Sequence, residues 1–113
     1  MKIITEKIKI SELNDMAKDM YGSLVKGVVD IKKEILAVDG ELHADEEALL
    51  LEKGSMQKDL WGINLYPQLE GDDFIEFDSV INIRPSMGNK TRSVDNEETK
   101  EQIKMVVNKL ILR

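Results

Sequence analysis

The chain contains one histidine, and three of the four residues after it are acidic. His43 precedes Asp45, Glu46 and Glu47, and side chains of these types can bind a metal ion. Carboxylates suit Ca²⁺, Mg²⁺ or Mn²⁺, whereas an added imidazole favours Mn²⁺ or Zn²⁺. The spacing matches neither HExxH nor an EF-hand loop. The same residues could therefore form an ordinary solvent-exposed polar face.

The direction of these side chains depends on the pair Asp39-Gly40. Asp-Gly favours a two-residue type I′ hairpin turn, and here it lies between two apolar-rich runs. We predict a hairpin of strands near 27–38 and 41–52, because that register aligns apolar pairs and Lys–Glu pairs across the turn. The competing interpretation is a helix, since residues 44–53 have a helix-favouring composition. In the hairpin four side chains share one face and form the predicted metal site: Glu34, His43, Asp45 and Glu47.

A second group of charged residues could bind an anion. Three basic residues lie in or just before the polar segment 85–95, namely Arg84, Lys90 and Arg92. This segment leads into the start of a predicted helix, where free backbone N–H groups favour negative charge. Neither a Walker loop nor a Rossmann glycine pattern is present. The alternative is a flexible surface loop in which Asp95, Glu97 and Glu98 take the place of a ligand.

The elements that would position these groups predict an α+β fold. Apolar residues at helical spacing indicate a helix over about 12–21 and a last helix that begins at Asp95 or Asn96. Alternating residues predict strands, and the clearest of these is FIEFDSVINIRP. We expect an antiparallel meander sheet of four to five strands, with the two amphipathic helices packed mainly on one face. Residues 1–113 should form a single domain.

Composition excludes several classes of function. The net charge is −6, which argues against nonspecific nucleic-acid binding and against an anionic membrane surface. The chain has no cysteine, so disulfides, thiolate metal sites and cysteine nucleophiles are excluded. The charged N-terminal segment does not resemble a signal peptide, and no apolar run is long enough to span a membrane. The expected location is the cytoplasm.

Apolar residues on the sheet face that we expect the helices to leave open predict self-association. These residues are Leu36, Leu49, Leu51 and Leu60. Trp61 shares a face with Ile63 and Leu65, which indicates a place in the core. Tyr66 lies on the opposite face with Asn64 and could line a polar groove.

Three segments carry a resemblance to a known family. They read ELHADEEALLLEKGS, DLWGINLYP and FIEFDSVINIRPSMGN. Together they resemble a family of small bacterial and archaeal proteins known only as a domain of unknown function. The similarity runs along nearly the whole chain, and it implies no substrate, cofactor or catalytic residue.

We therefore expect a small cytosolic binding protein that forms a homodimer. The alternative is a metal-dependent enzyme that acts on a phosphate-containing or other anionic ligand, with the predicted metal and anion residues in those roles. Neither a nucleophile elbow nor a Cys/His pair is present, so the sequence marks no nucleophile. The sequence leaves the cofactor and the ligand open.

Overall fold

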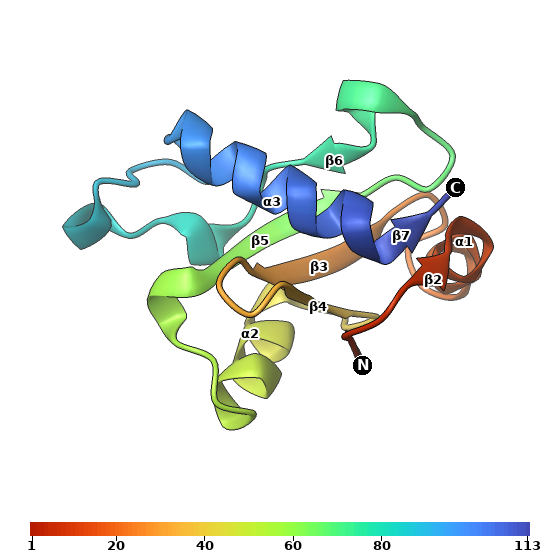
Figure 1. Cartoon of the computed structure of the whole chain (residues 1–113), viewed down its shortest axis with the longest axis horizontal. Helices are drawn as coiled ribbons and strands as arrows, with labels where there is room; N and C mark the ends of the chain where they lie inside the picture. Colours follow the sequence, from red (N-terminus) through yellow and green to blue (C-terminus); the bar gives the residue numbers. More distant parts are fainter.

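The computed structural model describes all 113 residues and has the predicted α+β fold (Figure 1). Five strands form one antiparallel sheet in the order β1–β4–β3–β5–β6. Their bounds are β1 Lys2–Ile4, β3 Val25–Asp30, β4 Ile35–Val38, β5 Leu60–Leu65 and β6 Ile75–Glu76. A separate parallel pair joins β2 (Ile8–Lys9) near the start of the chain to β7 (Ile111–Leu112) at its end.

The structure has three α-helices rather than the two that we expected. They are α1 (Ile10–Asp19), α2 (His43–Glu52) and α3 (Glu97–Leu110). Four single 3-10 turns lie between them: η1 (Gln57–Asp59), η2 (Gly71–Asp73), η3 (Val80–Asn82) and η4 (Pro85–Met87). No helix is long and apolar enough to cross a membrane.

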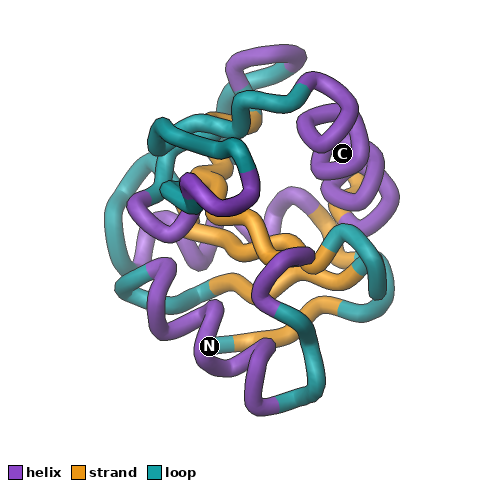
Figure 2. Tube along the Cα trace, turned by 90° about the vertical axis from the view of Figure 1, so that its left-hand side faces the viewer, coloured by secondary structure: helices purple, strands orange, loops and turns teal.

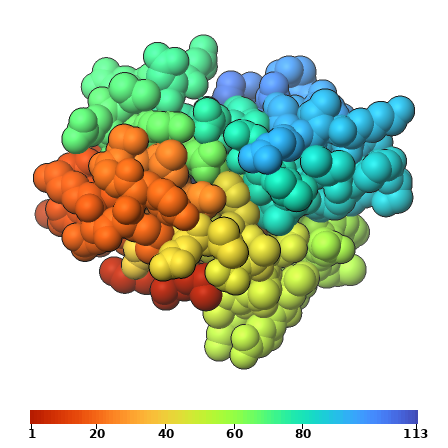
Figure 3. Space-filling view, turned by 180° about the vertical axis from the view of Figure 1, so that it is seen from behind, coloured from red at the N-terminus to blue at the C-terminus, as the bar shows by residue number.

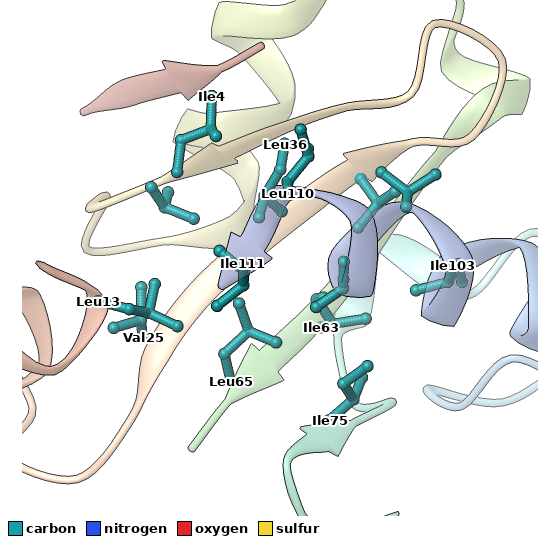
Figure 4. Packing of buried hydrophobic residues seen from close by; sticks show 14 of the residues in the cluster. Ile4, Leu13, Val25, Leu36, Ile63, Leu65, Ile75, Ile103, Leu110 and Ile111 are labelled. Carbon is teal, nitrogen blue, oxygen red and sulfur yellow. The ribbon is translucent and has the colours of Figure 1, made fainter. Parts of the chain in front are cut away.

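The main core lies between one face of the sheet and the helices α1 and α3 (Figure 4). Leu13 of α1 and Ile103 of α3 are fully buried there, against Ile63 and Leu65 of β5. Both helices present the apolar stripe that their sequences predicted, and Asn96 caps α3 by accepting a hydrogen bond from the Thr99 N–H at 3.0 Å. Trp61 is part of this core, as predicted.

The helix α2 covers the other face of the sheet, so the strands form a middle layer between helices (Figure 2). Its Leu50 packs with Val28, Ala37 and Leu60 in a second, smaller core. This helix covers only part of the sheet face. Further along β3 and β5 the same face carries Lys26 directly opposite Asn64, and these polar residues lie beyond the apolar cluster.

The predicted hairpin around Asp39-Gly40 is wrong, because residues 43–52 form α2 instead of a strand. The hairpin that exists lies within the predicted first strand, where β3 and β4 pair through a turn at residues 31–34. That turn is stabilised by Asp30, whose carboxylate accepts from the N–H groups of Lys32 and Lys33, each at 2.9 Å. The second predicted strand therefore does not exist. The shared strand face on which the predicted metal ligands would have met is also absent.

The long strand predicted for residues 74–85 is also wrong, since only Ile75–Glu76 pairs as β6. The chain then turns away through η3. The Asn82 side chain bonds to the backbone of Gly62 where a neighbouring strand would pair. Its Oδ1 accepts from the Gly62 N–H at 2.8 Å, and its Nδ2 donates to the Gly62 carbonyl at 2.9 Å. One side chain thus satisfies the backbone groups that a neighbouring strand would otherwise pair.

Candidate functional site

A pocket lies where the start of α2 meets η3 and the segment that follows it, over the polar end of β3. We call it the His43 pocket, and its volume is about 220 Å³. Its lining residues are Lys26, Leu42, His43, Ala44, Ser79, Val80, Ile81 and Arg92. Figure 3 shows this face of the molecule, on which the segment around residues 43–50 lies beside the segment around 80–90.

His43 is held in the pocket wall with one ring nitrogen bound and the other free. Its Nε2 lies 2.7 Å from the Ile63 carbonyl oxygen. A carbonyl oxygen only accepts, so Nε2 carries the proton and Nδ1 has the lone pair. Nδ1 has no partner within the protein and is not among its sealed unpartnered atoms. The imidazole therefore offers the pocket a hydrogen-bond acceptor of fixed orientation.

The electrostatic surroundings keep this imidazole neutral. Burial is the main cause that lowers the pKa of His43. The charges of Lys26 and Arg92 lower it as well, whereas the bond to Ile63 and the charge of Asp78 act in the opposite direction. At neutral pH the positive charge of the pocket lining therefore comes from Lys26 and Arg92, and the imidazole contributes a neutral hydrogen-bond acceptor.

The two cations of the pocket have donor groups to spare. Lys26 forms no ion pair, and its ammonium group lies 5.2 Å from the ring centroid of Tyr21. Arg92 binds Asp78 through Nε alone, at 2.6 Å, so both of its terminal amino groups are free of protein partners. Because Arg92 is more than half exposed, this ion pair adds little to stability. The two residues therefore bring to the pocket lining three nitrogen donors that have no hydrogen-bond partner in the protein.

The wall opposite α2 is fixed by buried polar contacts. Ser79 is buried against Gly62, where an added Cβ would lie 2.5 Å from the Ser79 Cβ. The backbone N–H of Ser79 donates to the Arg92 carbonyl at 3.0 Å, and Asn82 Nδ2 donates to the same oxygen at 3.0 Å. These bonds tie η3, β5 and the Arg92 segment into one unit, so the wall is preorganised.

The structure separates the three residues of the predicted anion site. Arg84 is committed elsewhere: its guanidinium lies 4.5 Å from the Trp61 ring centroid and donates to the carbonyls of Ile81, Gln57 and Leu60. Lys90 is exposed, and its backbone N–H donates to Asp95 at 2.9 Å. Of the three, Arg92 alone lines the His43 pocket. Anion binding by the full set stays a prediction.

The four residues of the predicted metal site are also dispersed. Glu34 lies in the β3–β4 turn and pairs with Lys109 of α3 at 3.1 Å, whereas His43, Asp45 and Glu47 lie along α2. No group of three or more histidine or carboxylate side chains lies close enough together to hold a metal ion. The shared face from which the metal site was predicted is therefore absent. Metal binding by these four residues stays a prediction that the geometry does not support.

The apolar face predicted for self-association is largely internal. Leu36 and Leu60 are fully buried, Leu49 is half-buried, and Leu51 is exposed. The expectation that all four would lie on one open face is wrong. Leu36 lies in the main core with α1 and α3, Leu60 lies under α2 on the other face, and Leu49 and Leu51 belong to α2 itself. Tyr66 donates to Glu76 at 3.1 Å, outside the His43 pocket.

Sequence reasoning selected His43 and Arg92 for different sites, and the fold brings them to the same pocket. It missed Lys26 and Ser79. Lys26 had a usable signal, since it is the one charged residue in the interior of VKGVVD, a strand otherwise rich in valine. Ser79 had none, because its place depends on the turn that follows β6.

Comparison with known proteins identifies a family and no function. The family model described as "Protein of unknown function (DUF5674)" matches residues 2–110. This match confirms the resemblance to a domain of unknown function, while the bacterial and archaeal origin stays an expectation. No curated protein matches the chain, and no solved structure does.

Proposed function

The chain belongs to the DUF5674 family, whose function is unknown, and from its own geometry we propose that it is a binding protein for a small organic anion. The observation that supports this is the convergence of Lys26, Arg92 and the neutral imidazole of His43 on one pocket. The chain as a whole carries a net charge of −6. A pocket with two cations in such a chain is a local exception, and it would concentrate negative charge.

The pocket also restricts the size and chemistry of the ligand. About 220 Å³ is smaller than the pockets that hold drug-sized molecules. The ammonium of Lys26 and the free amino groups of Arg92 would bind a carboxylate or phosphate. His43 Nδ1 would accept a hydrogen bond from a hydroxyl or N–H on the same ligand, and the apolar residues of the lining would contact its carbon atoms. A 2-hydroxy acid has these three features.

A titration calorimetry experiment at pH 7 tests the proposal with glycolate, acetate and inorganic phosphate as probes. Glycolate should bind more tightly than acetate, because only glycolate carries the hydroxyl that Nδ1 would accept. Replacing Lys26 with alanine should weaken glycolate binding at least tenfold, which corresponds to about 1.4 kcal/mol. The matched control is Lys90→Ala, which removes an exposed lysine outside the pocket. Equal losses in the two variants, or no binding of any probe, would refute the proposal.

Self-association is a second candidate function, because two apolar side chains at the pocket are exposed to solvent. Leu42 is 54% exposed and Val80 is 62% exposed. A second copy of the chain would cover them and form a homodimer. Val80→Lys should then shift sedimentation towards monomer, whereas Met105→Lys, on the exposed side of α3, should not. A wild-type chain that sediments as a monomer at high micromolar concentration would remove this candidate.

The cytoplasm remains the expected location of the protein, and cell fractionation would test it. The alternative of a metal-dependent enzyme has less support than binding, because the predicted metal ligands are dispersed. His43 does have the lone pair that a general base requires. Turnover of a hydroxy acid in the absence of added metal would favour an enzyme over a binding protein.

A further inference from the structure

Beneath α2 lies a carboxyl group that the His43 pocket does not use. Glu46 is completely buried. Its Oε2 accepts one hydrogen bond, from the Gly40 N–H at 3.0 Å, and its Oε1 is sealed from solvent without a partner. A Cβ on Gly40 would lie 2.7 Å from the Glu46 Cγ, so the loop before α2 packs directly against this side chain. An ionised carboxylate here would have one donor where it needs several.

No opposite charge is close enough to pair with this carboxylate. The charged groups that influence it are Lys26 of β3, the N-terminal amine and Asp39 of the preceding loop. The two cations favour ionisation and Asp39 opposes it, yet none forms an ion pair with Glu46. Burial outweighs them and raises the pKa of Glu46 to about 9. The side chain is therefore neutral at pH 7.

Glu46 and His43 lie one turn apart on the sheet-facing side of α2, and both are buried. The start of this helix has no side-chain cap. Its polar attachments to the rest of the fold are the His43–Ile63 bond and the Gly40–Glu46 bond, beside the apolar contact of Leu50. Whatever displaces Glu46 from the sheet therefore also strains the bond that orients the imidazole.

We propose that the proton on Glu46 keeps α2 docked on the sheet and thereby regulates the His43 pocket. When that proton passes to solvent, the carboxylate must reach water, so the first half of α2 lifts and the Nε2–Ile63 bond breaks. The effect of this opening on ligand binding rests on the proposed binding function. The opening itself requires no ligand. High pH opens the pocket wall, and neutral pH closes it.

Amide hydrogen exchange of the ligand-free protein between pH 6 and pH 10 tests the inference. The Glu46→Gln variant mimics the protonated side chain, and Asp45→Asn changes an exposed carboxylate of the same helix as a control. After correction for the intrinsic rates, protection of the α2 amides in wild type should fall at least tenfold relative to Glu46→Gln by pH 10. The Asp45→Asn variant should follow wild type.

The ¹³Cδ resonance of Glu46 provides a second measurement on the wild-type chain, in case the glutamine variant does not fold. It should titrate above pH 7 and no higher than about pH 9, because opening of α2 lowers the apparent pKa below that of the docked side chain. Loss of α2 protection should have the same midpoint. A midpoint below pH 7, or a titration that leaves α2 protected, overturns the inference. Opening of α2 in a chain that binds no probe at pH 7 supports the inference and refutes the binding function instead.

Discussion

Replacing Asn82 with alanine should destabilise the protein more than its position in a short turn suggests. The side chain is fully buried and forms three hydrogen bonds, two with the Gly62 backbone and one with the Arg92 carbonyl. Each bond contributes about 1 kcal/mol net, and each buried group left without a partner costs about 1–3 kcal/mol. We therefore expect a loss of about 3–5 kcal/mol, a large fraction of the usual 5–15 kcal/mol.

Urea denaturation followed by Trp61 fluorescence measures this loss. The matched control is Asn96→Ala, because Asn96 caps α3 at an exposed position by accepting from the backbone N–H and the hydroxyl of Thr99. Such a cap is worth about 1 kcal/mol. An Asn82→Asp variant keeps the acceptor for the Gly62 N–H but loses both donated bonds, so it should be almost as unstable as the alanine variant. If Asn82→Ala instead lowers the free energy of unfolding no more than Asn96→Ala does, the Asn82 side chain does not attach η3 to β5. That result would refute the preorganised pocket wall.

Three further predictions concern Gly62, the two buried titratable groups and metal ions. Gly62→Ala should destabilise the fold by about 1–3 kcal/mol through overpacking. Adding Ser79→Gly should restore part of the lost stability, because the added methyl group clashes with the Ser79 Cβ. A double variant no more stable than Gly62→Ala would refute that contact. Glu46 has a raised pKa, so its contribution is complete below pH 4.5 and is lost as the pH rises towards 9. Wild type should lose about 3 kcal/mol between pH 5 and pH 7.5 from this group, and urea melts of Glu46→Gln should lack that loss. The pKa of His43 is lowered, so its contribution is complete above pH 6.5 and is lost as the pH falls below that value; a His43→Gln variant should be less sensitive to acid in the same melts. Thermal melts with Mn²⁺, Zn²⁺ or Ca²⁺ should not shift, because the predicted ligands are dispersed, and a rise that a chelator reverses would restore the metal site.

The sequence predicts the elements that carry a regular apolar pattern and misses those that do not. The helices α1 and α3 and the strand β5 each present such a pattern, and all three were predicted. The helix α2 buries His43, Glu46 and Leu50, so two of its three inward residues are polar and no apolar stripe is visible. The residues of β6 and η3 alternate like a strand, but the Ser79 side chain accepts from the Ile81 N–H and favours a turn instead.

The candidate site is predictable in its residue types and unpredictable in its assembly. His43 and Arg92 stood out because one is the only histidine and the other belongs to a basic group in an acidic chain. Their meeting depends on how α2 and η3 pack on the sheet. Two side chains contribute to that packing through hydrogen bonds to the backbone: His43 to Ile63, and Asn82 to Gly62. Such bonds leave no periodic signal in the sequence.

The ¹⁵N resonances of the His43 imidazole, followed during a glycolate titration at pH 7, test the central claim most directly. We predict a neutral ring with the proton on Nε2, held by the Ile63 carbonyl, and an unprotonated Nδ1. Saturating glycolate should move the Nδ1 resonance, because the ligand hydroxyl donates to it, while Nε2 stays protonated and the Lys26→Ala variant requires at least tenfold more glycolate. A cationic ring at pH 7, or an Nδ1 resonance that does not move at concentrations that saturate the rest of the pocket, would contradict the account.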